Sequence, residues 1–341
     1  MPRLILTSEV SMPLRDRAID PKSRSISISR IQDSPQERDL SEPVNCHGFG
    51  RIRHFGAPTP SAWPSNPLPV LPAARFFEDR MPRDLRRAQV FQNSVCNWRC
   101  WYCYVPFSML KGDPAKSEFI PVDQLIDWYS SEPNPPAILD LSGGQPDLTP
   151  EWIPWTIQAL MDRGIQDDVY LWSDDNLSND FAFAYLSEAD WDLMRSYPGY
   201  GRVGCFKGFD DSSFSFNTGA EPHNFQTQFD VFRRLLERGI DLYAYITLTC
   251  PRPSHPDPAG SVRTMLDRLG EIDERLPLRT VPLEIQVFSP MLRRLRELER
   301  SALDYQHEVA EAWMDELEKR FALEELEASG LWHRTQPGSQ G

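Results

Sequence analysis

The chain has 341 residues, 40% of them hydrophobic, and a formal net charge of −14. This length is enough to bury a full core in one large domain or in two modest ones. The acidic charge argues against a broad nucleic-acid-binding surface, which needs clustered Lys and Arg. No apolar run approaches the ~20 residues of a membrane helix, and the N-terminus lacks the apolar length of a secretory signal. We therefore expect a cytoplasmic protein that does not enter a membrane.

The first 85 residues have no sustained hydrophobic period. Residues 1–45 alternate Ser, Arg, Asp and Pro, which predicts a mostly disordered tail. Residues 46–85 are rich in proline and aromatic residues, which predicts an irregular extension that wraps around the outside of the domain. This extension either closes over an active site or only packs as an arm.

Apolar runs typical of strands alternate with amphipathic helical stretches from residue 86 to about residue 290. This alternation predicts an α/β fold whose parallel strands are joined by right-handed crossovers. Residues 291–341 are charged and predict a C-terminal helical extension. In chain order, the sequence predicts strands at 87–93, 137–142, 168–172, 201–206, 241–248 and 282–288, and helices at 121–129, 150–163, up to about 197, 223–238 and 262–276.

Three of the six cysteines lie within eight positions, directly after the first predicted strand. Cys96, Cys100 and Cys103 have the spacing C-x3-C-x2-C, and Tyr102 directly precedes the last of them. A short loop of this kind lets three thiolates converge on one small inorganic centre. Because a four-iron cluster normally takes four thiolates, three cysteines leave one iron free to bind a small molecule.

A zinc site is the alternative interpretation of the three cysteines. It would need a fourth ligand such as Cys46 or His47, but structural zinc loops usually show a second pair of ligands, and the sequence has none. A disulfide framework is not favoured by six cysteines in a chain of this length. The iron–sulfur interpretation is therefore preferred, and a non-catalytic zinc-binding interaction protein remains the alternative from another class.

The cysteine stretch resembles the signature of the radical S-adenosylmethionine (radical SAM) superfamily, with Tyr102 in its aromatic position. The resemblance covers roughly residues 86–290. It implies a partial (βα)6 TIM-type barrel with a [4Fe–4S] cluster on Cys96, Cys100 and Cys103 and with S-adenosylmethionine as the second cofactor. The reduced cluster would cleave S-adenosylmethionine to methionine and a 5′-deoxyadenosyl radical, which abstracts hydrogen from a small-molecule or protein substrate. A one-electron donor such as flavodoxin or ferredoxin is then a required partner.

In βα barrels the chemistry lies at the carboxyl ends of the strands. The second predicted strand ends in Gly143-Gly144-Gln145-Pro146, which is similar to the superfamily's GGEP motif. The resemblance implies that Gly143, Gly144 and Gln145 contact the methionine amino group of S-adenosylmethionine. Gln145 stands in place of the glutamate, so one charged acceptor is missing; its amide oxygen accepts more weakly than a carboxylate.

The third and fourth predicted strands end in further candidates. By analogy with the superfamily, Ser173 and Asp174 would reach the ribose of S-adenosylmethionine, whereas helix capping or turn formation explains these residue types equally well. Lys207 begins a KGFD stretch similar to that of the subgroup around glycyl-radical activating enzymes, and it would face the carboxylate of S-adenosylmethionine. Cys205 stands where the subgroup has aspartate.

Two other enzyme functions follow from the resemblance. The KGFD stretch supports a glycyl-radical activase that acts on a partner protein, although Cys205 weakens that interpretation. An RNA-modifying radical enzyme is disfavoured by the acidic charge. Thr247 and Gln286, at the ends of the fifth and sixth predicted strands, are possible pocket residues, and Cys250 is either a late catalytic thiol or a small buried side chain.

Overall fold

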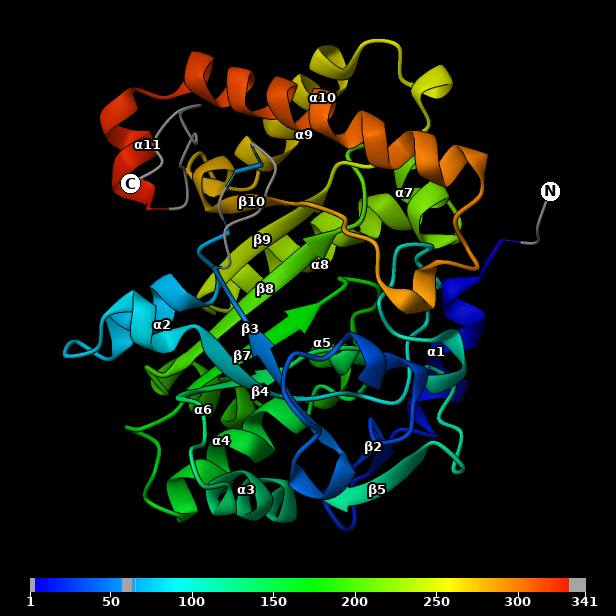
Figure 1. The fold of residues 1–341 in the computed structure, drawn as a ribbon. Coiled ribbons are helices and arrows are strands. Elements are labelled where there is room, and N and C mark those ends of the chain that lie inside the picture. Colours follow the sequence, from blue (N-terminus) through cyan, green and yellow to red (C-terminus); the bar gives the residue numbers. More distant parts are fainter. Residues whose placement is uncertain (1–3, 57–62, 65, 331–341) are drawn as a thin grey trace.

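The computed structural model describes residues 4–56, 63–64 and 66–330, and its centre is a twisted β-sheet (Figure 1). Six of the strands pair in parallel and in chain order, from β4 to β10, and β3 pairs antiparallel with β4 at one edge. In order across the sheet, the strands are β10 (Thr280–Leu283), β9 (Leu242–Thr247), β8 (Tyr200–Phe206), β7 (Tyr170–Asp175), β6 (Ile138–Leu141), β4 (Arg87–Phe91) and β3 (Gly50–His54).

Helices connect the parallel strands, as the alternating sequence pattern predicts. Local signals position several of them: Ser187 caps one helix, and Asp210 of the KGFD stretch caps another by accepting from the backbone of Ser213. The expected α/β class with six βα units is confirmed, and among the described residues the sheet is open because β10 and β3 do not pair with each other. The connecting helices are α3 (Val122–Ser131), α4 (Trp152–Asp162), α5 (Phe181–Tyr185), α6 (Glu188–Ser196), α7 (Asp211–Thr218), α8 (Asn224–Glu237) and α9 (Pro258–Gly270).

The two faces of the sheet have different coverings, since successive side chains of a strand point to opposite faces. The helix-covered face packs against the connecting helices in the largest apolar cluster, and its members include Leu139, Leu171, Phe206 and Ile246. The opposite face, here called the inner face, packs in part against α2 (Val70–Phe76). Its members include Ile138, Tyr170, Trp172, Val203, Cys205 and Tyr245.

The expectation of a disordered tail over residues 1–45 is wrong for residues 4–45. This segment forms α1 (Thr7–Arg15), β1 (Ile19–Asp20) and β2 (Ser25–Ser29), and β2 pairs antiparallel with β5 (Ser117–Pro121) in a second sheet. All five residues of β2 are buried. The serines of this Ser-Ile-Ser-Ile-Ser strand tolerate burial because they find partners, as where Ser94 Oγ lies 2.7 Å from Ser27 Oγ. Residues 1–3 lie outside the described residues.

The extension over residues 46–85 also differs from its expected irregular form. It contributes the edge strand β3 and the helix α2, which packs on the inner face rather than around the outside of the domain. Residues 57–62 and 65, which include part of its proline-rich stretch, lie outside the described residues.

The end of the chain differs in detail from its expected form. The sixth parallel strand comprises Thr280–Leu283, earlier and shorter than predicted, so that Gln286 lies beyond it as an exposed residue hydrogen-bonded to Glu284. The C-terminal extension forms α10 (Glu297–Arg320), which packs on α9, and α11 (Leu323–Ser329); residues 331–341 lie outside the described residues. In the described part of the chain, no helix combines the length and the apolar character that a membrane span requires.

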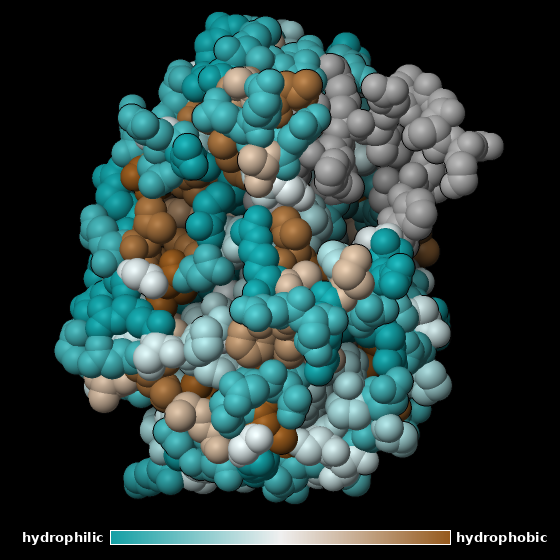
Figure 2. Space-filling model, turned by 90° about the vertical axis from the view of Figure 1, so that its left-hand side faces the viewer, coloured by the Kyte–Doolittle hydropathy of each residue, from teal (hydrophilic) through white to brown (hydrophobic). Residues whose placement is uncertain are grey.

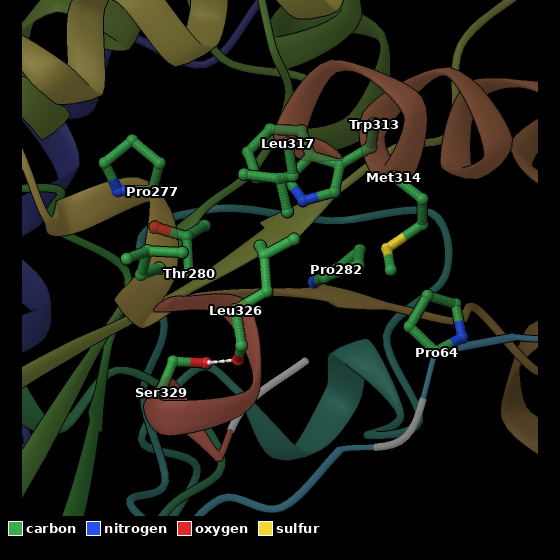
Figure 3. Close-up of a pocket in the computed structure, with 10 residues that line it drawn as sticks. Pro64, Pro277, Thr280, Pro282, Trp313, Met314, Leu317, Leu326 and Ser329 are labelled. Atoms are coloured by element: carbon green, nitrogen blue, oxygen red, sulfur yellow. Dashed lines mark hydrogen bonds between the residues drawn. The ribbon is translucent and has the colours of Figure 1, made fainter. Parts of the chain in front are cut away.

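Figure 2, which views the left-hand side of Figure 1, shows a largely hydrophilic surface with hydrophobic side chains in recesses between polar ridges. A small pocket, with a cavity volume of about 10 Å³, lies between α10, α11 and residues 277–282 (Figure 3). Pro282, Trp313, Leu317 and Leu326 are among the residues that line it. None of the candidate site residues lines this pocket, so we do not assign the chemistry to it.

Candidate metal centre and its surroundings

The three motif cysteines lie on the loop that follows β4, at the carboxyl edge of the sheet. Cys96 and Cys100 are buried, and Cys103 is half-buried. Burial raises the pKa of all three thiols, that of Cys100 to about 12, and the neighbouring sulfurs raise the pKa of Cys100 and Cys103 further. The three sulfurs therefore lie within electrostatic reach of one another, and thiolates here need a positive partner such as a metal centre.

Two arginines fix the backbone of this loop. Arg99 donates to the carbonyl oxygens of Cys96 and Trp98, the latter at 2.7 Å. Arg294, three positions before the first residue of α10, donates to the carbonyl oxygens of Cys100 and Trp101, both at 3.3 Å. Sequence reasoning missed Arg294 because a single arginine in a charged C-terminal stretch carries no signal of this contact.

The glycine turn after β6 packs directly against the start of the cysteine loop. Gly143 and Gly144 have φ angles of +89° and +66°, in the left-handed region that favours glycine. A Cβ on Gly144 would collide with the carbonyl oxygens of Asn93 and Val95, so this close approach requires glycine. Both glycines keep partly exposed backbone, and that backbone is available to a ligand.

Gln145, by contrast, does not present its side chain to the open side of the turn. The residue is completely buried. Its Nε2 donates to Asp175 Oδ1 at 2.8 Å, and its Oε1 accepts from the backbone N–H of Asn176 at 3.0 Å. Because both polar ends have internal partners, the structure does not support a direct contact between this side chain and a cofactor.

Ser173 and Asp174 are adjacent in β7 and point to opposite faces of the sheet. Ser173 is buried on the helix-covered face, where its Oγ lies 2.9 Å from the hydroxyl of Tyr200. Asp174 is half-buried on the inner face and accepts from Trp172 Nε1 at 3.1 Å. The structure therefore brings Asp174, and not Ser173, to the inner side of the carboxyl edge.

Lys207, at the end of β8, lies close to the cysteine loop. Burial disfavours its ammonium, but the nearby Cys205, Tyr102 and Cys100 outweigh burial and raise the pKa of Lys207. Within the described residues, no carboxylate lies within ion-pair distance of it. A cation beside three thiols and without an acidic partner is suited to an anionic ligand.

A charged cluster that the sequence analysis missed lies on the inner face. Nη1 of Arg53 lies 3.1 Å from Asp140 Oδ2 and 3.8 Å from Asp174 Oδ2. Asp140 is completely buried, its Oδ1 has no hydrogen-bond partner, and burial together with the charge of Asp174 raises its pKa to about 7. The one available signal was an acidic residue inside the apolar strand Ile138–Leu141.

The other cysteines have separate surroundings. Cys46 is buried, and its backbone N–H donates to Glu132, while His47 packs on Trp128 with ring centroids 4.7 Å apart. Cys250 is fully buried beside His255. In residues 4–56, 63–64 and 66–330, no three Cys, His, Asp or Glu side chains are placed to hold a single metal ion. This holds for Cys96, Cys100 and Cys103 as well, so it does not distinguish a zinc site from an iron–sulfur cluster.

Comparison with known proteins adds only distant similarities. No family model matches the sequence, and no curated protein matches it. SuiB of Streptococcus suis bound to S-adenosylmethionine is 12% identical, with a TM-score of 0.44 over 67% of this chain and 47% of that one. The radical S-adenosylmethionine methyltransferase TsrM of Kitasatospora setae, with cobalamin and a [4Fe–4S] cluster bound, is 15% identical, with a TM-score of 0.38 over 55% and 34%.

A third solved structure is similar over more of its length. TYW1 with a lysine–pyruvate adduct bound is 13% identical, with a TM-score of 0.41 over 79% of this chain and 84% of that one. The present chain, however, spans less than half of the SuiB and TsrM chains. At such identities and TM-scores, the similarities do not decide the family, and the assignment of a function depends on the residues of the site.

Proposed function

We propose that the protein is a radical SAM enzyme. The observation that carries the proposal is the convergence, at one edge of the sheet, of the C-x3-C-x2-C loop, the Gly143-Gly144 turn and the unpaired cation Lys207. The turn contacts the loop through the hydrogen bond from Gln145 N to Val95 O at 2.7 Å, and Lys207 lies within electrostatic reach of Cys96 and Cys100. The carboxyl edge is also where βα folds place their chemistry.

The donor set fits an iron–sulfur cluster. Cys96, Cys100 and Cys103 would hold a [4Fe–4S] cluster, and three thiolates leave one iron for an outside ligand. With S-adenosylmethionine, this cluster would supply the electron and the 5′-deoxyadenosyl radical that abstracts hydrogen from the substrate. The contribution of the chain is to hold the loop through Arg99 and Arg294 and to keep water away from two buried sulfurs.

S-adenosylmethionine would contact residues from three strand ends. The partly exposed backbone of Gly143 and Gly144 would meet its amino-acid moiety, and Lys207 would pair with its carboxylate. Asp174, on the inner face, is suited to accept from sugar hydroxyls. Gln145 and Ser173, which the sequence also assigned to this cofactor, act indirectly in this proposal because their polar groups have internal partners.

The substrate would approach the inner face. Arg53 and Asp174 retain 28% and 23% of their side-chain exposure there, beside the buried Asp140. Cys205 lies within electrostatic reach of Asp174 and Arg53 of this cluster and also of Lys207. We propose a small molecule or a protein as the substrate and an external one-electron donor as a partner. A glycyl-radical activase that acts on a partner protein is the alternative within this proposal.

Anaerobic reconstitution tests the function. Wild-type protein, Cys100→Ala and the matched control Cys46→Ala would be compared for iron and sulfide content, for the electron paramagnetic resonance spectrum after dithionite reduction, and for 5′-deoxyadenosine formed from S-adenosylmethionine. We expect about four irons per chain and deoxyadenosine formation in the wild type and in Cys46→Ala. Cys100→Ala should lose both. Stoichiometric zinc without deoxyadenosine would overturn the proposal in favour of a structural metal site.

A further inference from the structure

Asn176, the residue directly after β7, aims its side chain at a motif cysteine. Its Nδ2 lies 3.7 Å from Sγ of Cys96, within hydrogen-bonding distance for a sulfur acceptor. The NH2 group of an asparagine amide is a donor only, so Nδ2 of Asn176 can donate to this sulfur but cannot accept from it. Hydrogen bonds to the ligating sulfurs are among the main means by which proteins tune iron–sulfur clusters.

The backbone of Asn176 is held on both sides by buried glutamines. Its N–H donates to Gln145 Oε1 at 3.0 Å, and its carbonyl oxygen accepts from Gln228 Nε2 at 2.7 Å. Gln228, on α8, also donates to the carbonyl oxygen of Cys205 at 2.7 Å and accepts from the N–H of Lys207 at 3.1 Å. The backbone of Asn176 is thus held by the turn after β6 and by α8, and this places the start of its side chain beside Cys96.

Gln145 is itself fixed by a buried ionic network on the helix-covered side. Its Nε2 donates to Asp175 Oδ1, and Arg202 lies 2.6 Å from both Asp175 Oδ2 and Asp147 Oδ1. Asp175 Oδ1 also accepts from the N–H of Leu177, whose φ of +57° turns the chain sharply after Asn176. Position 145 therefore needs a side chain that both donates to Asp175 and accepts from the N–H of Asn176. Glutamine does both, whereas an ionised glutamate only accepts.

We propose that Asn176 donates an N–H···S hydrogen bond to Cys96 that raises the reduction potential of the bound cluster, and that Gln145 acts through Asn176 as a positioning residue. The inference rests on the proposed function, since it concerns the cluster that Cys96 would hold. A donor to the thiolate withdraws negative charge from the cluster and stabilises the reduced, more negative state more than the oxidised state. In this chain, the glutamine of GGQP therefore positions the hydrogen-bond donor to the cluster and does not accept from the ammonium group of the cofactor.

The test is a redox titration monitored by electron paramagnetic resonance on anaerobically reconstituted full-length protein without S-adenosylmethionine. Asn176→Ala removes the donor, and the near-isosteric Asn176→Asp replaces it with an acceptor while both backbone contacts remain. Asn179→Ala is the matched control, because Asn179 lies three residues further along and contacts Ser178 and Phe181 instead of a cysteine. Gln145→Leu would be measured alone and combined with Asn176→Ala.

Both Asn176 variants should retain the cluster. Their reduction potential should be lower by about 59 mV, which for a one-electron couple corresponds to a tenfold lower ratio of reduced to oxidised cluster. Asn179→Ala should titrate like the wild type. Gln145→Leu should lower the potential alone and add nothing to Asn176→Ala. Wild-type potentials in Asn176→Asp, with full iron content, would overturn the inference and leave the proposed function intact. A wild-type protein that assembles no four-iron cluster would overturn the proposed function, and this inference with it.

Discussion

The hydroxyl of Tyr102 lies 3.1 Å from Oγ1 of Thr247 and so joins the cysteine loop to the end of β9. The two residues are far apart in the chain, and their contact crosses the carboxyl edge of the sheet from the loop after β4 to its fifth parallel strand. Burial and the adjacent Cys100 raise the pKa of Tyr102, so the phenol stays neutral, and either hydroxyl can donate in this hydrogen bond. The contact gives the loop an anchor apart from its cysteines.

We expect Tyr102→Phe and Thr247→Val each to lower the free energy of unfolding by about 1 kcal/mol, the usual net value of one hydrogen bond. The double variant should lose less than the sum, because either change alone removes the shared contact. Urea denaturation of the four proteins without metal measures this coupling. Strict additivity would show that the contact contributes nothing to stability.

Lys207 provides a test of cofactor binding. If its ammonium pairs with the carboxylate of S-adenosylmethionine, Lys207→Met should weaken binding to the reconstituted protein by about tenfold or more, because a hydrogen bond between charged groups contributes about 1.5–3 kcal/mol. Isothermal titration calorimetry measures the change, and the exposed Lys22→Met serves as the control. An unchanged affinity in Lys207→Met would remove Lys207 from the cofactor site.

The buried network predicts the effect of restoring the glutamate of the motif. Gln145→Glu would place a second carboxylate against Asp175, which already pairs with Arg202, and we expect a loss of about 3 kcal/mol in the free energy of unfolding. Asp175→Asn added to Gln145→Glu should recover part of that loss, because it removes one of the two charges. If Gln145→Glu alone were as stable as the wild type, the hydrogen bond between Gln145 and Asp175 would not explain the departure from the motif.

The ion pair of His255 with Asp210 predicts a pH dependence of stability. His255 Nε2 lies 2.9 Å from Asp210 Oδ2, and Tyr305 donates to the carbonyl oxygen of His255 at 2.6 Å. Burial alone would lower the pKa of His255, but hydrogen bonds with Asp210 and Cys250 outweigh it and raise the pKa to about 10. Since the folded protein holds this proton more tightly than the unfolded chain, the ion pair stabilises fully below about pH 6.5 and its contribution is lost as pH rises towards 10.

Urea denaturation of the wild type and His255→Gln between pH 6 and pH 10 measures this contribution. The difference in free energy of unfolding should be largest at about pH 6 and shrink steadily as the pH rises. A difference that stays constant with pH would mean that folding leaves the pKa of His255 unchanged. The nearby Arg252 pairs with Glu308 in both proteins, so this ion pair cancels from the comparison.

Local patterns of the sequence predicted much of the central fold and the positions of the motif residues. Apolar runs followed by amphipathic stretches determine the alternation of β4 to β10 with helices, because each segment contains its own periodicity. The spacing of Cys96, Cys100 and Cys103 and the paired glycines at 143 and 144 are equally local. The proposed roles of these residues rest on their chemistry, and the structure contributes their placement at one edge.

Contacts between distant segments could not be read from such patterns. β2 reads as a polar tail because its partner β5 lies about 90 residues further along, and its serines become acceptable in a buried strand only once that pairing supplies hydrogen bonds. The same holds for β3, whose pairing with β4 brings Arg53 to Asp140. Arg294 reaches the cysteine loop from the far end of the chain.

The sequence by itself determined which residue types are present and on which loops and strand ends they lie. Only the tertiary structure decided which way each side chain points and which partner it meets. Alternation along β7 turns Ser173 to the helix-covered face and Asp174 to the inner face, and the buried network around Arg202 draws Gln145 away from the open edge towards Asn176. The physical reason is that hydrogen bonding and burial depend on neighbours brought close by strand register, which no local pattern contains.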